Sequence, residues 1–252
     1  MKLNNKIAII TGSSRGLGKA IAIGFAREGC NIIIAARSET EGKLAGTIYE
    51  TAEEIKALGR EVLALKCDVT SEESVNNMVQ KVLEHFGRID ILVNNAGAAS
   101  YYPSVVETPL KRWELVIKVN LIGSFLCAKA VLPKMMEQMQ GSIINISSVA
   151  ATDRGPSAPG VAYGVSKAAL ERFTWGLATE AGKYNIAVNA LKPNGIVDTE
   201  GMRAILPKEA WSQFVSPDRM VKAAIFLASQ DAKGVTGMVA YDEEICAWHG
   251  LV

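Results

Sequence analysis

Short apolar runs alternate with longer amphipathic stretches along the whole chain. The runs predict strands at 7–10, 31–35, 62–66, 91–94, 142–147, 186–191 and 238–241. Strands separated by helices usually pair in parallel, because each connection must cross over the sheet. Unbroken apolar runs such as IIIAA further indicate strands that are covered on both faces. The pattern therefore predicts an α/β fold, a doubly wound parallel sheet with helices on both faces.

Composition agrees with a single domain over residues 1–252. The 252 residues are 49% hydrophobic, which is enough to bury one sizeable core, and no linker or repeat interrupts the pattern. The formal net charge of +1 gives no reason to expect nucleic acid or a membrane as a partner. The amino end lacks the apolar stretch of a signal peptide, so we expect a cytoplasmic protein. The 4 cysteines form no CxxC pair, so neither a disulfide nor a metal site is expected.

A glycine-rich segment, TGSSRGLG, follows the first predicted strand and precedes an amphipathic helix. In this context such a turn binds the phosphates of a dinucleotide, as in a Rossmann-like fold. Gly12 permits the tight turn, Gly16 lets backbone amides approach a pyrophosphate, and Gly18 lets the helix pack closely on the sheet. The free amides and the dipole at the helix start favour an anion there.

Tyr163 and Lys167 are spaced so that both side chains lie on one face of a helix, one turn apart. A phenol with its ordinary pKa of about 10 is a poor proton donor at neutral pH. A neighbouring ammonium favours the phenolate and so lowers that pKa. Ser148, at the end of a predicted strand, adds a hydroxyl that can hold a carbonyl oxygen. The same spacing also occurs on ordinary solvated helices, and it gains weight here from the dinucleotide motif upstream.

Together these motifs resemble those of the classical short-chain dehydrogenase/reductase family. TGSSRGLG stands at 11–18, Asp68 follows the third strand, NNAG stands at 94–97, Asn120 lies in VNLIGSF, and YGVSK follows Ser148. The resemblance runs nearly end to end and implies hydride transfer between a nicotinamide cofactor and a carbonyl or alcohol. Two further segments, GKLAGTIYETAEEI and VTGMVAYDEE, resemble the hydroxysteroid-dehydrogenase-like branch.

The resemblance implies a role for each motif. Tyr163 would be the proton donor in reduction, Lys167 would lower its pKa and hold the nicotinamide ribose, and Ser148 would orient the carbonyl oxygen. Asn120 would anchor a water in a proton relay, with helix capping as the alternative. Ser147 rivals Ser148, but strand alternation points it to the opposite face. The implied cofactor contacts are Gly12, Ser14, Arg15, Gly16, Leu17, Gly18, Arg37, Asp68, Val69, Asn95, Ala96, Gly97, Tyr163, Lys167, Val197 and Thr199.

The residues that end the second strand indicate which nicotinamide cofactor is bound. An acidic residue there would hydrogen-bond a ribose 2′-hydroxyl and repel a 2′-phosphate. This chain has Ala36 in that place, followed by Arg37, with Arg15 in the glycine-rich segment able to reach the same region. Two guanidiniums without a carboxylate favour NADP(H), with NAD(H) as the second choice. In the alternative reading Arg37 merely opens a loop and pairs with Glu39.

Two other positions allow more than one reading. Asp68 resembles the family's adenine-contacting aspartate, yet an aspartate at a strand end is also an ordinary capping residue. The segment VNALKPNGIVDTEG carries one residue more than the family pattern before Thr199. The nicotinamide contact is therefore Val197 if Thr199 sets the alignment, which we prefer, and Ile196 if Pro193 does.

Substrate loops are expected at 98–108, 149–162 and 195–216. Their side chains are largely apolar or aromatic, which predicts a pocket for a hydrophobic ketone or aldehyde, with the last segment as a mobile lid. Packing against the core or another subunit would explain the same residues. Arg154 and Arg203 would instead suit an acyl-carrier phosphate or a carboxylate. The expected pocket residues are Tyr101, Tyr102, Met202, Ile205, Leu206, Trp211 and Phe214.

The sequence therefore predicts an NADP(H)-dependent oxidoreductase that reduces a ketone or aldehyde to an alcohol, or runs the reverse reaction. One alternative is a dehydrogenase of a secondary alcohol such as a steroid or sugar alcohol, and another is a nucleotide-binding sensor without catalysis. A sensor would be expected to have lost Tyr163 or Lys167, and both are present. The resemblance also implies a homo-oligomer, a dimer or homotetramer, paired through the helices that follow Asn120 and Tyr163.

Overall fold

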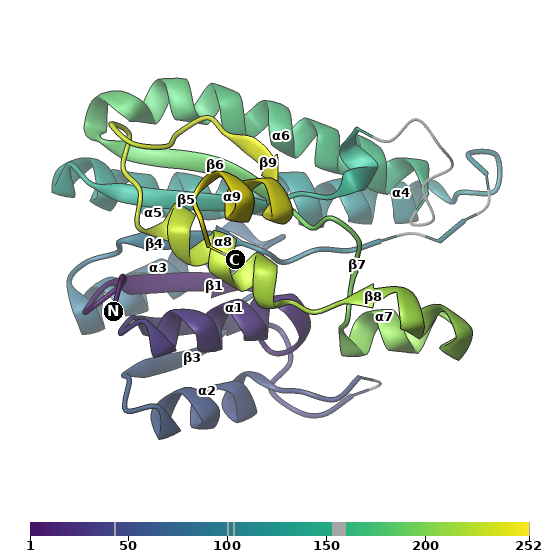
Figure 1. Cartoon of the computed structure of the whole chain (residues 1–252), viewed down its shortest axis with the longest axis horizontal. Helices are drawn as coiled ribbons and strands as arrows, with labels where there is room; N and C mark the ends of the chain where they lie inside the picture. Colours follow the sequence, from purple (N-terminus) through teal and green to yellow (C-terminus); the bar gives the residue numbers. More distant parts are fainter. Residues whose placement is uncertain (43, 100, 103, 153–159, 252) are drawn as a thin grey trace.

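The computed structural model describes residues 1–42, 44–99, 101–102, 104–152 and 160–251. Its centre is a seven-stranded sheet in the order β3-β2-β1-β4-β5-β6-β9, and every neighbouring pair of strands is parallel. Helices cover both faces of this sheet (Figure 1), which confirms the predicted fold class. The strands are β1 (Ile7–Thr11), β2 (Asn31–Ala36), β3 (Val62–Lys66), β4 (Ile91–Asn94), β5 (Gly141–Ile146), β6 (Ile186–Lys192) and β9 (Val239–Tyr241).

Two hydrophobic cores lie between the sheet and its helices. The helices that pack on the sheet are α1 (Gly16–Arg27), α2 (Ile48–Ala57), α3 (Glu72–Phe86), α5 (Gly123–Gln138), α6 (Val161–Ala181), α8 (Asp218–Ala228) and α9 (Asp242–Trp248). Ala8 and Ile10 of β1 face the core formed with α1, α2, α8 and α9. Ile7 and Ile9 face the core formed with α3, α5 and α6. Successive strand residues thus serve opposite cores, which explains the unbroken apolar runs.

The apolar pattern located the sheet to within one residue at each strand end. Predicted strands 62–66 and 91–94 match β3 and β4, and the remaining strands begin or end one residue away from the prediction. A second sheet of two short strands, β7 (Ile196–Val197) and β8 (Phe214–Val215), was not predicted. This pair joins the two ends of the segment expected to form a lid, which contains α7 (Glu200–Ile205) and the 3₁₀ helix η4 (Lys208–Gln213).

One continuous helical stretch precedes β5. It consists of α4 (Leu110–Ile117), a π-helical turn η1 (Lys118–Ile122) and α5. By length and composition alone this stretch is apolar enough to cross a membrane. In the structure, however, Cys127 and Val131 of α5 are buried against the sheet. Burial in a protein core therefore accounts for part of its apolar character.

Candidate active site

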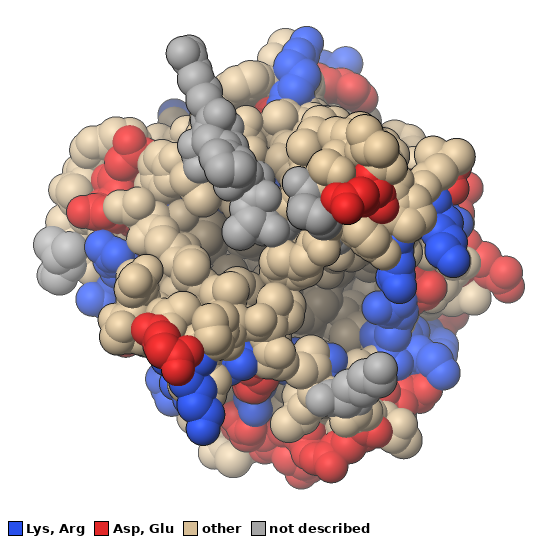
Figure 2. Space-filling model, turned by 90° about the vertical axis from the view of Figure 1, so that its right-hand side faces the viewer, with Lys and Arg blue, Asp and Glu red and all other residues tan. Residues whose placement is uncertain are grey.

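A cavity of about 770 Å³ lies at the edge of the sheet where the parallel strands end, and Figure 2 shows it as a hollow in the surface. Ligands of doubly wound α/β proteins bind at this edge. Asn120, Gly16 and Gly18 are not among the described residues that line the cavity. The predicted residues that do line it are Gly12, Ser14, Arg15, Leu17, Arg37, Asp68, Val69, Asn95, Ala96, Gly97, Ser148, Tyr163, Lys167, Val197 and Thr199.

Two glycines of the phosphate loop have no room for a side chain. Gly12 has a φ of +67°, and a Cβ on it would lie 2.9 Å from Cα of Ala96. A Cβ on Gly18 would lie 2.6 Å from the carbonyl oxygen of Gly12 and would also collide with Asn95. Nδ2 of Asn95 donates to the carbonyl oxygens of Thr11 and Gly12 at 2.9 and 3.2 Å. The loop, the start of α1 and the end of β4 are therefore packed directly on one another.

The start of α1 binds the carboxylate of Glu200, a residue of the same chain. The Gly16 amide donates to Oε2 of Glu200 at 3.0 Å. Arg15, at the N-cap position, makes no side-chain capping bond to this helix. The Glu200 carboxylate stands where a phosphate oxygen would bind, because free amides and the helix dipole favour negative charge. The loop therefore fits the pyrophosphate of a dinucleotide, and Glu200 is a residue that sequence reasoning missed.

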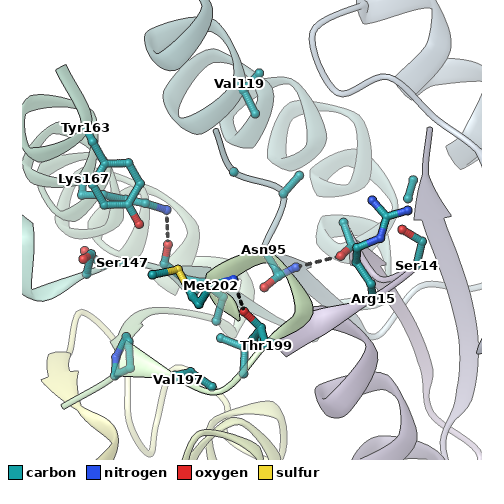
Figure 3. Close-up of a pocket in the computed structure, with 18 of the residues that line it drawn as sticks. Ser14, Arg15, Asn95, Val119, Ser147, Tyr163, Lys167, Val197, Thr199 and Met202 are labelled. Carbon is teal, nitrogen blue, oxygen red and sulfur yellow. Dashed lines mark hydrogen bonds between the residues drawn. The ribbon is translucent and has the colours of Figure 1, made fainter. Parts of the chain in front are cut away.

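Tyr163 and Lys167 lie one turn apart on α6 and line the cavity together (Figure 3). Nζ of Lys167 lies 5.6 Å from the centre of the Tyr163 ring and donates to the carbonyl oxygen of Ile146 at 2.6 Å. Burial lowers the pKa of Lys167 to about 8. Burial raises the pKa of Tyr163, and a hydrogen bond with Ser148 acts in the opposite direction. Lys167 is not among the groups that shift the pKa of Tyr163 here, and its ammonium is turned to the backbone of Ile146.

Ser147 and Ser148 bind partners on different elements, as alternation along an extended chain predicted. Oγ of Ser148 accepts from the amide of Ala150 at 3.2 Å and caps the 3₁₀ helix η2 (Val149–Ala151). Oγ of Ser147 is buried and donates to Oε1 of Glu171 at 2.7 Å. Both serines line the cavity, but the hydroxyl of Ser147 is engaged by Glu171.

Asn120 lies in the π-helical turn η1 and is fully buried. Its Oδ1 accepts from the Ala98 amide at 2.7 Å, and its Nδ2 donates to the Ala98 carbonyl oxygen at 3.0 Å and to Oγ of Ser166 at 2.9 Å. Ser166 in turn donates to the carbonyl oxygen of Tyr163 at 2.7 Å. Asn120 therefore ties the loop after β4 to α6, and Oδ1 keeps one lone pair for a water. A π-helical turn often marks a functional site.

The two guanidiniums expected near a 2′-phosphate are placed differently. Arg15 donates to the backbone carbonyl oxygens of residues 45–46 at 2.8 and 2.6 Å, so it ties the phosphate loop to the segment before α2. Arg37 is exposed and lines the cavity. Glu39, which the alternative reading paired with Arg37, instead binds Lys66 at 2.6 Å. Of the two arginines, Arg15 is engaged by the backbone, and Arg37 has no hydrogen bond to another described residue.

Asp68 stabilises a turn and also lies at the cavity. Its Oδ1 accepts from the amide and the hydroxyl of Thr70 at 2.9 and 2.8 Å, so it stabilises the turn before α3. It also lines the cavity. Burial acts to raise the pKa of Asp68, but the Thr70 hydrogen bonds and the charge of Arg37 hold that pKa below its ordinary value. Asp68 therefore presents a charged carboxylate to the cavity.

The segment between β7 and β8 forms one wall of the cavity. Thr199 caps α7 by accepting from the Met202 amide at 3.2 Å. Val197 and Ile196 both line the cavity, and Val197 is the more buried of the two. Of the expected pocket residues, those found in the lining are Tyr101, Met202 and Leu206, and those not found there are Tyr102, Ile205, Trp211 and Phe214. Val149 and Ala150, in the expected substrate loop 149–162, also line the cavity, and lining residues that sequence reasoning missed include Leu44, Cys67 and Val119.

Arg203 is engaged within this wall. Its Nε donates to Oδ1 of Asp198 at 2.5 Å, and its guanidinium lies 4.9 Å from the centre of the Trp211 ring. A guanidinium held by a carboxylate and an aromatic face does not suit the phosphate or carboxylate contact considered for it. Arg154, the other arginine considered for that contact, lies outside the described residues.

Comparison with known proteins agrees with this geometry. The family model described as short chain dehydrogenase matches residues 6–210. The matched segment contains the phosphate loop, Ser148, Tyr163 and Lys167. The chain therefore belongs to the short-chain dehydrogenase family.

Curated relatives confirm the family and the predicted branch. Hydroxysteroid dehydrogenase-like protein 2 of Bos taurus is 39% identical over 251 residues, which cover 99% of this chain and 59% of that protein. The chain thus spans about three fifths of the length of that relative. Glucose 1-dehydrogenase 2 of Bacillus subtilis (strain 168) is 37% identical over 248 residues, which cover 95% of this chain and 93% of the relative.

Solved structures share the fold. A short-chain type dehydrogenase/reductase from Mycobacterium marinum has a TM-score of 0.85 and 28% identity, over 95% of this chain and 94% of that one. A protein from Beutenbergia cavernae, inferred to be an NAD(P) dependent gluconate 5-dehydrogenase, has a TM-score of 0.84 and 30% identity, over 95% of this chain and 96% of that one. The latter structure contains NADP bound at low occupancy.

Proposed function

We propose that this protein is an NADP(H)-dependent oxidoreductase that interconverts a ketone or aldehyde and an alcohol, with Tyr163 as the proton donor. The observation that carries the proposal is that Tyr163, Ser148 and Lys167 line one cavity, with Nζ of Lys167 5.6 Å from the centre of the Tyr163 ring. Carbonyl reduction requires a proton donor next to a group that holds the substrate oxygen. The phosphate loop lines the same cavity, which supports a dinucleotide as the second ligand.

In the proposed mechanism the nicotinamide, when bound, supplies or accepts the hydride. Ser148 orients the carbonyl oxygen, and the hydroxyl of Tyr163 gives that oxygen its proton. The raised pKa of Tyr163 keeps the phenol protonated until an oxyanion faces it. Lys167, with a pKa of about 8, is mostly charged at neutral pH and stabilises the phenolate that remains. The water that Asn120 would anchor completes a path for proton resupply.

The preference for NADP(H) rests on Arg37. It lines the cavity at the end of β2, where this chain has no acidic residue, and the neighbouring Glu39 is paired with Lys66. A guanidinium binds a phosphate through charge-assisted hydrogen bonds. Arg15, which the sequence placed beside Arg37, contributes instead by fixing the segment at residues 45–46. NADP bound to the Beutenbergia cavernae protein is consistent with this choice.

The proposed substrate is hydrophobic. The cavity wall near Tyr163 contains Tyr101, Val149, Met202 and Leu206, which offer apolar contacts and one phenol. Oxidation of a secondary alcohol is the second candidate reaction, favoured by the similarity to a glucose 1-dehydrogenase and to hydroxysteroid dehydrogenase-like proteins. The same residues would serve either direction, because the proton that Tyr163 gives in reduction returns to it in oxidation.

A binding titration followed by a substrate panel tests the proposal. NADPH and NADH are titrated against the purified protein, and absorbance loss is then followed with hydrophobic ketones, β-keto esters, steroids and sugars. We expect tighter binding of NADPH and turnover with one class. Tyr163→Phe should abolish that turnover while leaving NADPH binding intact, because it removes only the hydroxyl. NADPH binding without turnover on any class would favour the sensor function, and substantial activity of Tyr163→Phe would refute the role of the phenol.

We further propose a cytoplasmic homo-oligomer that pairs through α5 and α6. The two helices expose several large apolar side chains, and Phe125 of α5 meets Phe173 of α6 with ring centres 6.4 Å apart. Apolar surface of this kind commonly marks a protein–protein contact. The exposed apolar residues of this region are Ile122, Phe125, Val165 and Trp175.

A further inference from the structure

A closed ring of hydrogen bonds adjoins the end of β5, formed by Ser147, Glu171 and Lys192 together with the backbone of Leu191. Oγ of Ser147 donates to Oε1 of Glu171 at 2.7 Å, and Nζ of Lys192 donates to the same oxygen at 3.2 Å. The amide of Ser147 donates to the carbonyl oxygen of Leu191 at 2.8 Å, and Leu191 directly precedes Lys192. Ser147, Glu171 and Lys192 are only 3%, 4% and 5% exposed. The ring therefore joins β5, α6 and β6 through side chains that are nearly buried, and one of its members, Ser147, lines the cavity.

Each of the three joined elements carries part of the candidate active site. Ser148 directly follows Ser147, and Tyr163 lies about two turns before Glu171 on α6. Pro193, which follows Lys192, lines the cavity. Any change in the ring therefore shifts cavity residues on three elements relative to one another.

Helix α6 holds the end of β5 at two successive residues. Lys167 donates to the carbonyl oxygen of Ile146, and Glu171, one turn further along α6, accepts from Ser147. Both contacts fall immediately before Ser148. The position of Ser148 relative to Tyr163 is thus set by two bonds that run between the strand and the helix carrying the phenol.

Stability alone does not explain the buried charges. A buried ion pair can often be replaced by apolar side chains without loss of stability, because removing two charges from water offsets their attraction. Lys192 also lies 4.7 Å from the centre of the Tyr241 ring, so its ammonium is fixed from a second side. An ion pair defines the positions of its two side chains more strictly than an apolar pair does. Here the pair also binds Ser147, the residue next to Ser148.

We propose that Glu171 and Lys192 are positioning residues, which act through Ser147 to hold Ser148 at the distance from Tyr163 that proton transfer requires. The inference rests on the proposed function, since it takes Ser148 and Tyr163 as the reacting pair. Neither Glu171 nor Lys192 touches the substrate in this role.

The first test compares two buried serines, Ser142 within β5 and Ser147 directly after it. Ser142 is 2% exposed, and its Oγ donates to the carbonyl oxygen of Leu227 at 2.9 Å, at the far end of β5 from the cavity. Ser147→Ala and Ser142→Ala each remove one buried hydroxyl and should lower the melting temperature by similar amounts. Only Ser147→Ala should lower kcat, by about 10- to 100-fold, because displacement of reacting groups slows the chemical step. The dissociation constant of NADPH should stay unchanged in both. Equal kcat values for the two variants would overturn the proposal.

The second test separates hydrogen bonding from charge. Glu171→Gln/Lys192→Met keeps an oxygen that accepts from Ser147 and leaves no unpaired charge. Glu171→Leu/Lys192→Met removes that acceptor as well. We expect the first double variant to keep most of kcat and the second to fall as far as Ser147→Ala. A fall of both by the same factor would show that the charges themselves, and not the position of Ser147, matter.

Crystal structures of Ser147→Ala and Ser142→Ala decide the question without any assay. The distance between Oγ of Ser148 and the hydroxyl of Tyr163 should increase in the first variant and stay unchanged in the second. An unaltered distance in Ser147→Ala would overturn the proposal. If the unaltered protein turns over no substrate at all, the proposed function fails by itself, while these two distances still show whether the ring positions Ser148.

Discussion

The carboxylate of Glu200 accepts a hydrogen bond of 3.0 Å from the amide of Gly16, although the two residues are 184 positions apart. Gly16 begins α1 and Glu200 begins α7, so this bond joins the phosphate loop to the cavity wall between β7 and β8. A pyrophosphate at the start of α1 requires the same amide. A dinucleotide bound there would therefore compete with Glu200 for this amide.

Replacing Glu200 with Gln should strengthen cofactor binding. The change removes a negative charge from the helix start where the phosphates would bind. The interaction of one charge with a helix terminus corresponds to about a two- to fivefold change in the dissociation constant. Fluorescence titration with NADPH measures the dissociation constant directly. Glu209→Gln, an exposed position in η4 of the same segment, should have no effect. Weaker binding by Glu200→Gln would mean that Glu200 helps to hold the cofactor rather than competing with it.

Replacing Arg37 with Asp should shift preference toward NAD(H). Loss of a charge-assisted hydrogen bond to the 2′-phosphate, together with repulsion by the new carboxylate, should lower the NADP(H)/NAD(H) ratio of kcat/KM about 10- to 100-fold. Arg112→Asp makes the same charge change at an exposed position of α4 and serves as the control. An unchanged ratio in Arg37→Asp would show that the phosphate is recognised elsewhere.

A methyl group on Gly18 should disrupt the phosphate loop. The added Cβ would lie 2.6 Å from the carbonyl oxygen of Gly12 and would displace Asn95, so we expect Gly18→Ala to lose measurable NADPH binding. Gly182 also has helical backbone, and a Cβ there meets no heavy atom within 4 Å. Gly182→Ala should therefore bind NADPH normally, as measured by the same titration. Normal binding by Gly18→Ala would contradict the close packing of the loop.

The features that the sequence predicted well are local ones. Apolar runs located the strands, because strands covered on both faces by helices are apolar at successive positions. Glu200 and Glu171 were missed, because their partners are distant in the sequence and no local pattern marks them. The bonds of Arg15 to the backbone of residues 45–46 were missed for the same reason.

Self-association should depend on Phe125. This side chain of α5 is 45% exposed, which leaves apolar area for a second subunit to cover. Phe125→Glu should weaken association about 10-fold or more, because it places a charge where an aromatic ring would be buried. Sedimentation velocity over a concentration series measures the change. Val106→Glu, at a loop residue that is 96% exposed, is the matched control. Unchanged association in Phe125→Glu would place the interface elsewhere.

Lys167→Met should stabilise the protein at neutral pH while abolishing its activity. Burial lowers the pKa of Lys167 from 10.5 to about 8, so folding at pH 7 places a charge where it is disfavoured. A difference of this size corresponds to about 3 kcal/mol. Loss of the hydrogen bond to Ile146 offsets about 1 kcal/mol. The free energy of unfolding should therefore rise by about 2 kcal/mol in the variant at pH 7.

The difference in unfolding free energy between Lys167→Met and the unaltered protein should decrease as pH rises from 8 to 10.5. Below pH 8 Lys167 is charged in both the folded and the unfolded chain, so the full penalty of burial is present. Between pH 8 and 10.5 the unfolded chain binds more protons than the folded one, so the unaltered protein gains stability as pH rises. Urea unfolding at pH 7, 8, 9 and 10 compares the two proteins, with Lys81→Met, at an exposed position of α3, as the control. A constant difference across this range would mean that Lys167 is not a buried charge in the folded protein.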